Sequence, residues 1–127
     1  MAGSVTVTTS DIGNGITKYS VAWTASAGGA VSGNAFGIKT GRLLWAKFAP
    51  SDESATQPTN AYDVTLTDDD GVDLLRGLGA NLSDSDETIQ PAVSVDFISH
   101  IEGDNLDLVI ANAGNAAEGR VDLFVGP

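Results

Sequence analysis

Cysteine is absent from this chain of 127 residues, and histidine occurs only once. The lack of thiols excludes disulfide bridges, thiolate zinc sites, iron–sulfur clusters and cysteine nucleophiles. Long apolar runs are also missing, and none approaches the roughly 20 residues that a membrane helix needs. The first four residues, MAGS, contain neither a basic nor an apolar segment, so we expect no secretory signal.

Basic side chains are scarce. Six of them stand against 17 acidic ones, which gives a formal net charge of −11. Such a surface repels polyanions, so we expect neither nucleic acid nor a membrane as a partner. The imbalance is uneven, because residues 1–64 are neutral and residues 65–127 hold the whole excess of acid. The only basic cluster in the sequence consists of Lys39, Arg42 and Lys47.

The sequence is rich in alternating patterns. Hydrophobic residues make up 42% of the chain, which is enough for a core, and the length favours one domain. Apolar and polar side chains alternate with the period of two that is typical of half-buried strands, and helical periodicity is nearly absent apart from a short helical turn over 72–78. The predicted strands span residues 5–8, 19–25, 30–39, 43–49, 62–67, 93–98, 106–111 and 121–125.

Eight strands at this spacing predict an all-β fold, an antiparallel β-sandwich or barrel with a jelly-roll-like arrangement. We expect a single domain over residues 1–127, of which residues 1–15 could form an extended arm. The last two strands, joined by a loop over 112–119, are expected to pair as a hairpin.

Alternation also predicts which side chains share a face. In the strand over 43–49 it places Leu44, Ala46 and Phe48 on one side. Two other strands are expected to bury faces made of Tyr19, Val21, Trp23 and Ala25, and of Tyr62, Val64 and Leu66.

The single histidine lies in the segment HIEGD, residues 100–104. In an extended strand His100, Glu102 and Asp104 would share one side and could hold a metal. A turn at Gly103-Asp104 is favoured, because metal sites generally use a second histidine or further carboxylates. Pairing of Glu102 with Asp104 for acid–base chemistry is the least favoured alternative, since nothing indicates a cleft between them. We therefore predict no enzymatic activity and no cofactor.

The acidic segment DDDGVD, residues 68–73, suggests calcium. In an EF-hand register its first and twelfth positions fall on Leu66 and Gly77, which cannot supply the required carboxylates. A hairpin turn in which the acids cap backbone amides is favoured. The alternative is a weaker calcium site made of Asp68, Asp70 and Asp73.

The large aromatic residues could form a platform on which sugars stack. A β core of this size would bury the same side chains, and we favour that interpretation. These residues are Tyr19, Trp23, Trp45 and Tyr62.

Two segments resemble a known family. The first is PTNAYDVTLTDDDGVDLLRGLGAN, residues 58–81. The second is the closing hairpin pattern NAGN at 112–115, followed by Gly119 and VDLFV at 121–125. Together these segments cover about a third of the chain and resemble small acidic structural proteins of tailed bacteriophages, among them capsid decoration (cement) proteins. Residues 1–40 lie outside the resemblance.

The resemblance implies a non-enzymatic virion component, all-β and homo-oligomeric, with a trimer favoured over a dimer. It implies that the major capsid protein is the partner and that the protein lies on the outer capsid surface. A tail or head–tail joint position is the nearest variant. A separate alternative is a carbohydrate-binding β-sandwich, calcium-assisted through the acids of residues 68–73, with Trp23 or Trp45 as the stacking platform.

The neutral and basic parts of the sequence are the best candidates for a contact surface, because the remainder repels other acidic surfaces. The predicted partner-contact residues are Val5, Val7, Lys39, Arg42 and Lys47.

Overall fold

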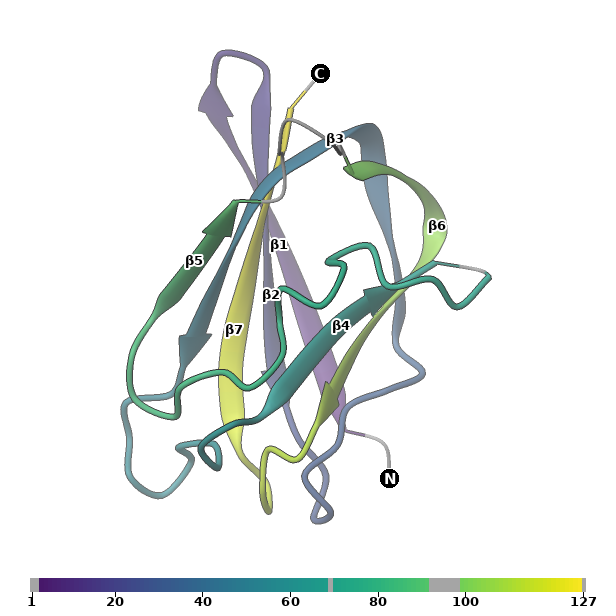
Figure 1. Ribbon diagram of the computed structural model, residues 1–127. Coiled ribbons are helices and arrows are strands. Elements are labelled where there is room, and N and C mark those ends of the chain that lie inside the picture. Colours follow the sequence, from purple (N-terminus) through teal and green to yellow (C-terminus); the bar gives the residue numbers. More distant parts are fainter. Residues whose placement is uncertain (1–2, 69, 92–98, 127) are drawn as a thin grey trace.

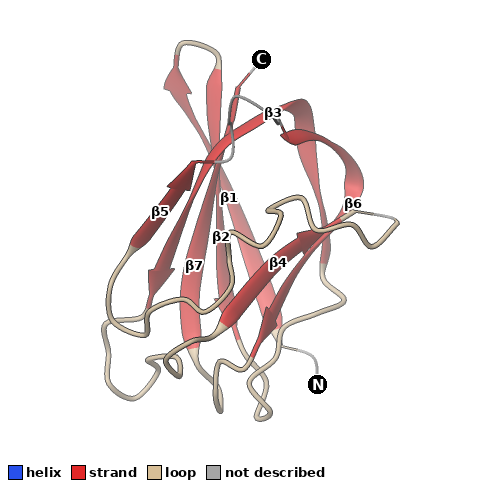
Figure 2. Ribbon diagram, viewed as in Figure 1, coloured by secondary structure: helices blue, strands red, loops and turns tan. Residues whose placement is uncertain are grey.

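The computed structural model describes residues 3–68, 70–91 and 99–126. Within these ranges every regular element is a β-strand, which confirms the predicted all-β class (Figure 2). The predicted strand over 93–98 lies outside the described residues. The strands are β1 (Ser4–Gly13), β2 (Ile16–Thr24), β3 (Ala35–Pro50), β4 (Asp63–Thr67), β5 (Thr88–Pro91), β6 (Ser99–Ala111) and β7 (Glu118–Gly126).

The strands form one antiparallel sheet in the order β1-β2-β7-β3-β6-β4, with β5 paired to β3. The two halves of β3 have different neighbours, because Ala35–Leu43 pairs with β6 whereas Arg42–Pro50 pairs with β7. The sheet therefore folds over at β3 into two layers, and Figure 1 shows β4 and β6 in front of the fainter β1 and β2. The five-stranded layer contains β1, β2, β7, the second half of β3, and β5; the three-stranded layer contains the first half of β3, β6 and β4.

Counting β3 once in each layer gives eight strand segments, in agreement with the predicted β-sandwich. The structure does not confirm a jelly-roll arrangement. The predicted hairpin between the last two strands is wrong, because β3 lies between β6 and β7 in the sheet. The loop after Ala111 instead carries the chain from the three-stranded layer to the five-stranded layer.

The core lies between the two layers, and alternation predicted its composition correctly in two strands. Tyr19, Val21 and Trp23 of β2 are buried, as are Tyr62 and the inward residues of β4. The rings of Trp23 and Tyr62 connect the layers, with centroids 5.7 Å apart and an interplanar angle of 49°. Burial of several large side chains supplies the main driving force for folding.

A β-bulge changes the phase of β3. The register shifts between Leu43 and Trp45, so Leu44 is the extra residue. As a result Leu43, not Leu44, is buried together with Ala46 and Phe48. The predicted face was therefore wrong at one position, because strict alternation cannot pass through a bulge.

The segment that follows β4 contains turns and no helix in its described residues. Backbone hydrogen bonds from Arg76 to Asp73 and from Leu78 to Leu75 close successive turns where a helical turn was predicted. The chain then runs along the free edge of β4, where the Val64 amide donates to the Gly79 carbonyl at 2.7 Å. This edge of the sandwich is therefore covered.

Residues 4–13 form β1, which pairs with β2 along its length. The hairpin turns at Gly13, Asn14 and Gly15, all of which have positive φ. Its tip projects away from the rest of the sandwich (Figure 1), and residues 8–15 are exposed.

Candidate functional site

The side chains of the five-stranded layer that point away from the core form its outer face. On this face Trp45 of β3 and Phe124 of β7 are register partners. Their rings stack with centroids 4.6 Å apart and an interplanar angle of 21°. Pro91 of β5 lies opposite Trp45 on the other side, and Ile89, which is 63% exposed, lies opposite Lys47. We call Phe124, Trp45, Pro91 and Ile89 the apolar ridge.

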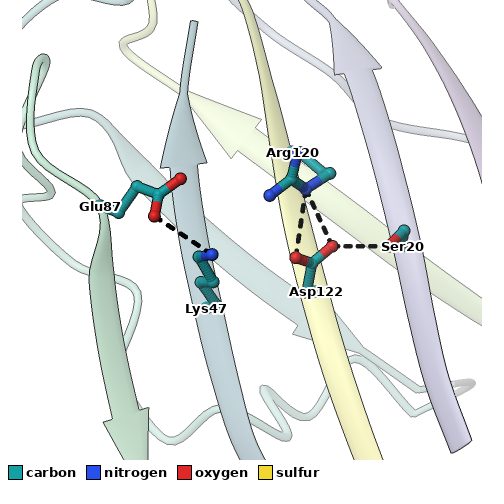
Figure 3. A network of polar contacts seen from close by, with 5 residues as sticks. All are labelled: Ser20, Lys47, Glu87, Arg120 and Asp122. Carbon is teal, nitrogen blue, oxygen red and sulfur yellow. Dashed lines mark hydrogen bonds and ion pairs between the residues drawn. The ribbon is translucent and has the colours of Figure 1, made fainter. Parts of the chain in front are cut away.

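Polar side chains form a network next to the apolar ridge (Figure 3). The Asp122 side chain is buried although it belongs to the outer face, and its Oδ1 accepts a hydrogen bond from the Ser20 hydroxyl at 2.7 Å. The Arg120 Nε donates to both oxygens of Asp122, at 3.0 and 3.1 Å. Lys47 pairs with Glu87 at 3.1 Å. A buried carboxylate requires such partners, because burial without them is strongly unfavourable.

An open groove of about 540 Å³ lies on the outer face beside this network. Its lining includes Arg120, threonine and serine side chains of β1 and β2, and four carboxylates. Such a lining can form hydrogen bonds and attract basic groups. Within the described ranges no three His, Cys, Asp or Glu side chains are arranged to hold a metal ion. The four carboxylates belong to Asp52, Glu53, Glu87 and Glu118.

Acids dominate the segment around β4, whereas the outer face carries charges of both signs. Residues 63–87 contain eight acids and a single base, Arg76. By register, Lys18, Lys47 and Arg120 all belong to the outer face. The neutral and acidic halves of the sequence do not correspond to the two layers of the fold. Strands β5 and β7 come from the acidic half, and both belong to the five-stranded layer.

The structure does not bring the five predicted contact residues onto one face. Val5 and Val7 are register partners of Trp23 and Val21, so they point inward and pack against the core. Lys47 belongs to the outer face, and Arg42 is exposed where β3 passes between the layers. Lys39 lies in β3, but its side chain is outside the description. Their role in partner contact stays a prediction.

Sequence reasoning missed the apolar ridge. Its members are far apart in the sequence, and only the pairing of β3 with β7 and β5 brings them together. The signal that could have found Ile89 is the alternation in TIQP, a short strand within a stretch that looked like a polar loop.

Two of the three candidate calcium ligands cap backbone amides. Asp68 Oδ1 accepts from the amides of Asp70 and Val72, at 2.9 and 3.0 Å. Asp73 accepts at both oxygens, Oδ1 from Leu66 and Leu75 and Oδ2 from Gly77, at 2.9 to 3.1 Å. These bonds confirm the turn-capping interpretation for Asp68 and Asp73.

The remaining candidates are corrected or lie outside the description. Trp23 is 2% exposed, so it cannot act as a stacking platform for sugars. The predicted turn at Gly103-Asp104 is wrong, because β6 continues through both residues and Gly103 pairs with Ile38. The side chains of His100, Glu102 and Asp104 lie outside the described part of the chain.

The two segments that suggested a phage family meet in the structure. The Asp63 carboxylate accepts hydrogen bonds from the Asn81 amide and from the Asn112 side chain, at 2.9 and 3.0 Å. The Thr59 amide donates to the Ala113 carbonyl at 2.8 Å. Asn81 and Asn112 both have positive φ, 55° and 62°, a conformation that asparagine tolerates better than most residues. These motif residues therefore hold turns together.

Comparisons with protein-family models, with curated proteins and with solved structures find no match for this chain. In the residues that the structure describes, no helix has the length and apolar character needed to cross a membrane.

Proposed function

We propose that this protein is a capsid decoration protein of a tailed bacteriophage, which binds the major capsid protein on the outer surface of the head and stabilises the shell. The resemblance of residues 58–81 and of the closing segment over residues 112–125 supports this proposal. The net charge of −11 also supports it, because an acidic protein is better suited to the outside of a head than to its DNA-facing side.

The observation that carries the proposal is the apolar ridge on the outer face. Pro91 of β5 lies opposite Trp45 of the stacked pair, and exposed Ile89 lies two residues before Pro91, opposite Lys47. Aromatic residues surrounded by polar ones are typical of the centre of a protein–protein interface. Lys47 and Arg120 flank this ridge and pair with Glu87 and Asp122, and the acids of residues 63–73 lie in β4 and the turns that follow it.

In this proposal the protein acts by binding and performs no reaction. The outer face docks on the capsid, and the acidic turns around β4 face solvent. Each docked copy adds contacts across the joints between capsid subunits, and the shell then resists forces that separate them. Anything that binds only the assembled state stabilises that state by mass action.

The proposal is tested with purified heads that lack the protein. Recombinant protein should sediment with these heads, and the loaded heads should keep their DNA at higher temperature and at lower ionic strength than bare heads. Sedimentation with isolated tails and not with heads would favour the tail or head–tail joint position. Binding to neither would refute a virion role.

Carbohydrate binding is a second candidate, because Trp45 lies on the same outer face as a groove lined by hydroxyl and carboxylate groups. Aromatic stacking next to hydrogen-bonding groups suits sugar recognition. Titration with a glycan panel should quench or shift the fluorescence of Trp45 if this function exists. In a Trp45→Phe variant only Trp23 remains, which is buried and borders the groove, so a signal that this variant keeps comes from Trp23 and not from stacking on Trp45.

A further inference from the structure

The edge of the five-stranded layer at β1 has the chemistry of a strand-pairing surface. β1 is the last strand in the sheet order, and within the described ranges it pairs only with β2. Its opposite edge therefore presents backbone donors and acceptors along a strand of ten residues. Such edges are templates for pairing with another strand.

The usual devices that block edge pairing are confined to the hairpin end of this strand, at Asp11 and at the bulge before Gly13. Residues 4–10, SVTVTTS, contain no charge, proline or glycine, in a chain whose net charge is −11. Proteins generally protect free edges with charged residues, proline, bulges or very short strands. Two other edges of the layers follow that rule, because β4 is covered by the segment ending at Gly79, and β5 contains Pro91.

We propose that β1 pairs with β1 of a second copy of this chain, antiparallel and around a two-fold axis, to form a dimer with one continuous sheet. The alternation is self-complementary in the register that places Val5 opposite the second copy's Val7 and Thr6 opposite itself. Valines then meet on the inner face and hydroxyl residues on the outer face, and both kinds of cross-strand pair are favourable. The pairing also completes the burial of Val5 and Val7, which are only partly buried against the core.

The distribution of charge favours a second copy as the occupant of this edge. Residues 4–10 of β1 are uncharged, so two copies can pair there without bringing like charges of the strand together. The only charge in β1 is Asp11, close to the hairpin tip. A two-fold axis at the edge is perpendicular to the sheet and directs both outer faces to the same side. The dimer thus doubles the outer face, and it replaces the trimer that the resemblance implies.

The dimer is tested on the free protein, without capsids. The dimer can therefore be refuted while capsid binding is confirmed, and capsid binding can be refuted while the dimer is confirmed. The full-length chain should sediment as a species of twice 13.0 kDa. Because the chain has no cysteine, a disulfide formed by a single-cysteine variant can only join the introduced position in two copies. Thr6→Cys should form a disulfide-linked dimer on mild oxidation. Ala22→Cys is the matched control, because Ala22 is exposed on the same face and is the register partner of Thr6, but belongs to the interior strand β2.

A dimer mass together with cross-linking at Thr6→Cys and little at Ala22→Cys supports the edge-paired dimer. A monomer mass at all accessible concentrations overturns it. So does a dimer or trimer in which Ala22→Cys cross-links as efficiently as Thr6→Cys, since the copies would then meet elsewhere.

Discussion

Trp45 of β3 and Phe124 of β7 stack on the outer face of the five-stranded layer, with ring centroids 4.6 Å apart. Trp45 begins the unbroken register of β3 with β7, which runs from there to Pro50. The bulge at Leu44, immediately before Trp45, directs Leu43 into the core. One extra residue in β3 thus determines which leucine fills the core next to the aromatic pair.

Gly119 should be one of the least replaceable residues of the core. A Cβ atom at this position would lie 2.5 Å from Cζ2 of Trp23, whose ring is held against Tyr62. We expect Gly119→Ala to lower the free energy of unfolding by about 1–3 kcal/mol, because the indole cannot move without disturbing the core. Urea denaturation measures the change. Gly28→Ala is the control and should be nearly neutral, since its nearest neighbour would be the Ser26 hydroxyl at 3.8 Å.

The two ion pairs of Figure 3 should differ in their effect on stability. Asp122→Ala removes a buried carboxylate and leaves the Ser20 hydroxyl and Arg120 Nε without their acceptor in a part-buried site, so we expect a loss of about 1–3 kcal/mol. Glu87→Ala removes only the exposed partner of Lys47 and should change stability by about 0–1 kcal/mol. Equal losses in the two variants, measured by denaturant unfolding, would contradict this interpretation of the network.

Asp73 should matter for folding and not for calcium. Its carboxylate accepts three backbone hydrogen bonds, so Asp73→Ala should lower the free energy of unfolding by about 1–3 kcal/mol. Asp70→Ala should have little effect, because Asp70 is exposed in the same turn. Millimolar calcium or a chelator should leave the melting temperature of the unaltered protein within experimental error. A rise in melting temperature with calcium that Asp73→Ala abolishes would establish a metal site instead.

Stability should fall in strongly alkaline solution because of Tyr62. Burial raises the pKa of Tyr62 from 10.0 to about 12. Between these values the unfolded chain loses the phenolic proton while the folded protein keeps it, so rising pH favours unfolding by at most about 1.4 kcal/mol per pH unit from this group. Below pH 10 the group contributes no pH dependence. The Tyr62→Phe variant keeps the ring, and its melting temperature should decline less between pH 10 and 12; an identical decline would show that Tyr62 is not responsible.

Alternation of apolar and polar residues predicted most strands and several of their buried faces. It did not predict which strands pair with each other. The period of two found the inward residues of β2 and β4, because in those strands one face meets the core and the other meets solvent. It could not predict that β3 changes layer, since that depends on β6 and β7 pairing with different halves of one strand.

The predicted contact residues show the same limit. Lys47 belongs to the outer face, whereas Val5 and Val7 point to the opposite side of the sheet, so charge in the sequence could not predict that these residues lie apart. Some motif residues that suggested a phage family, such as Asp63 and Asn112, hold turns in place, and others, such as Val64 and Leu123, fill the core. Phe124 belongs to both the closing motif and the apolar ridge.

The central claim is that the outer face docks on the capsid, and a comparison of two exposed hydrophobic residues tests it most directly. Ile89, 63% exposed, lies in the apolar ridge, and Val72, 55% exposed, lies in the acidic segment after β4. Glutamate at either position adds the same charge at an exposed site. Affinity for heads lacking the protein, measured by cosedimentation, should fall at least about tenfold for Ile89→Glu and remain unchanged for Val72→Glu. Unchanged binding of Ile89→Glu, or a greater loss for Val72→Glu, would contradict the account.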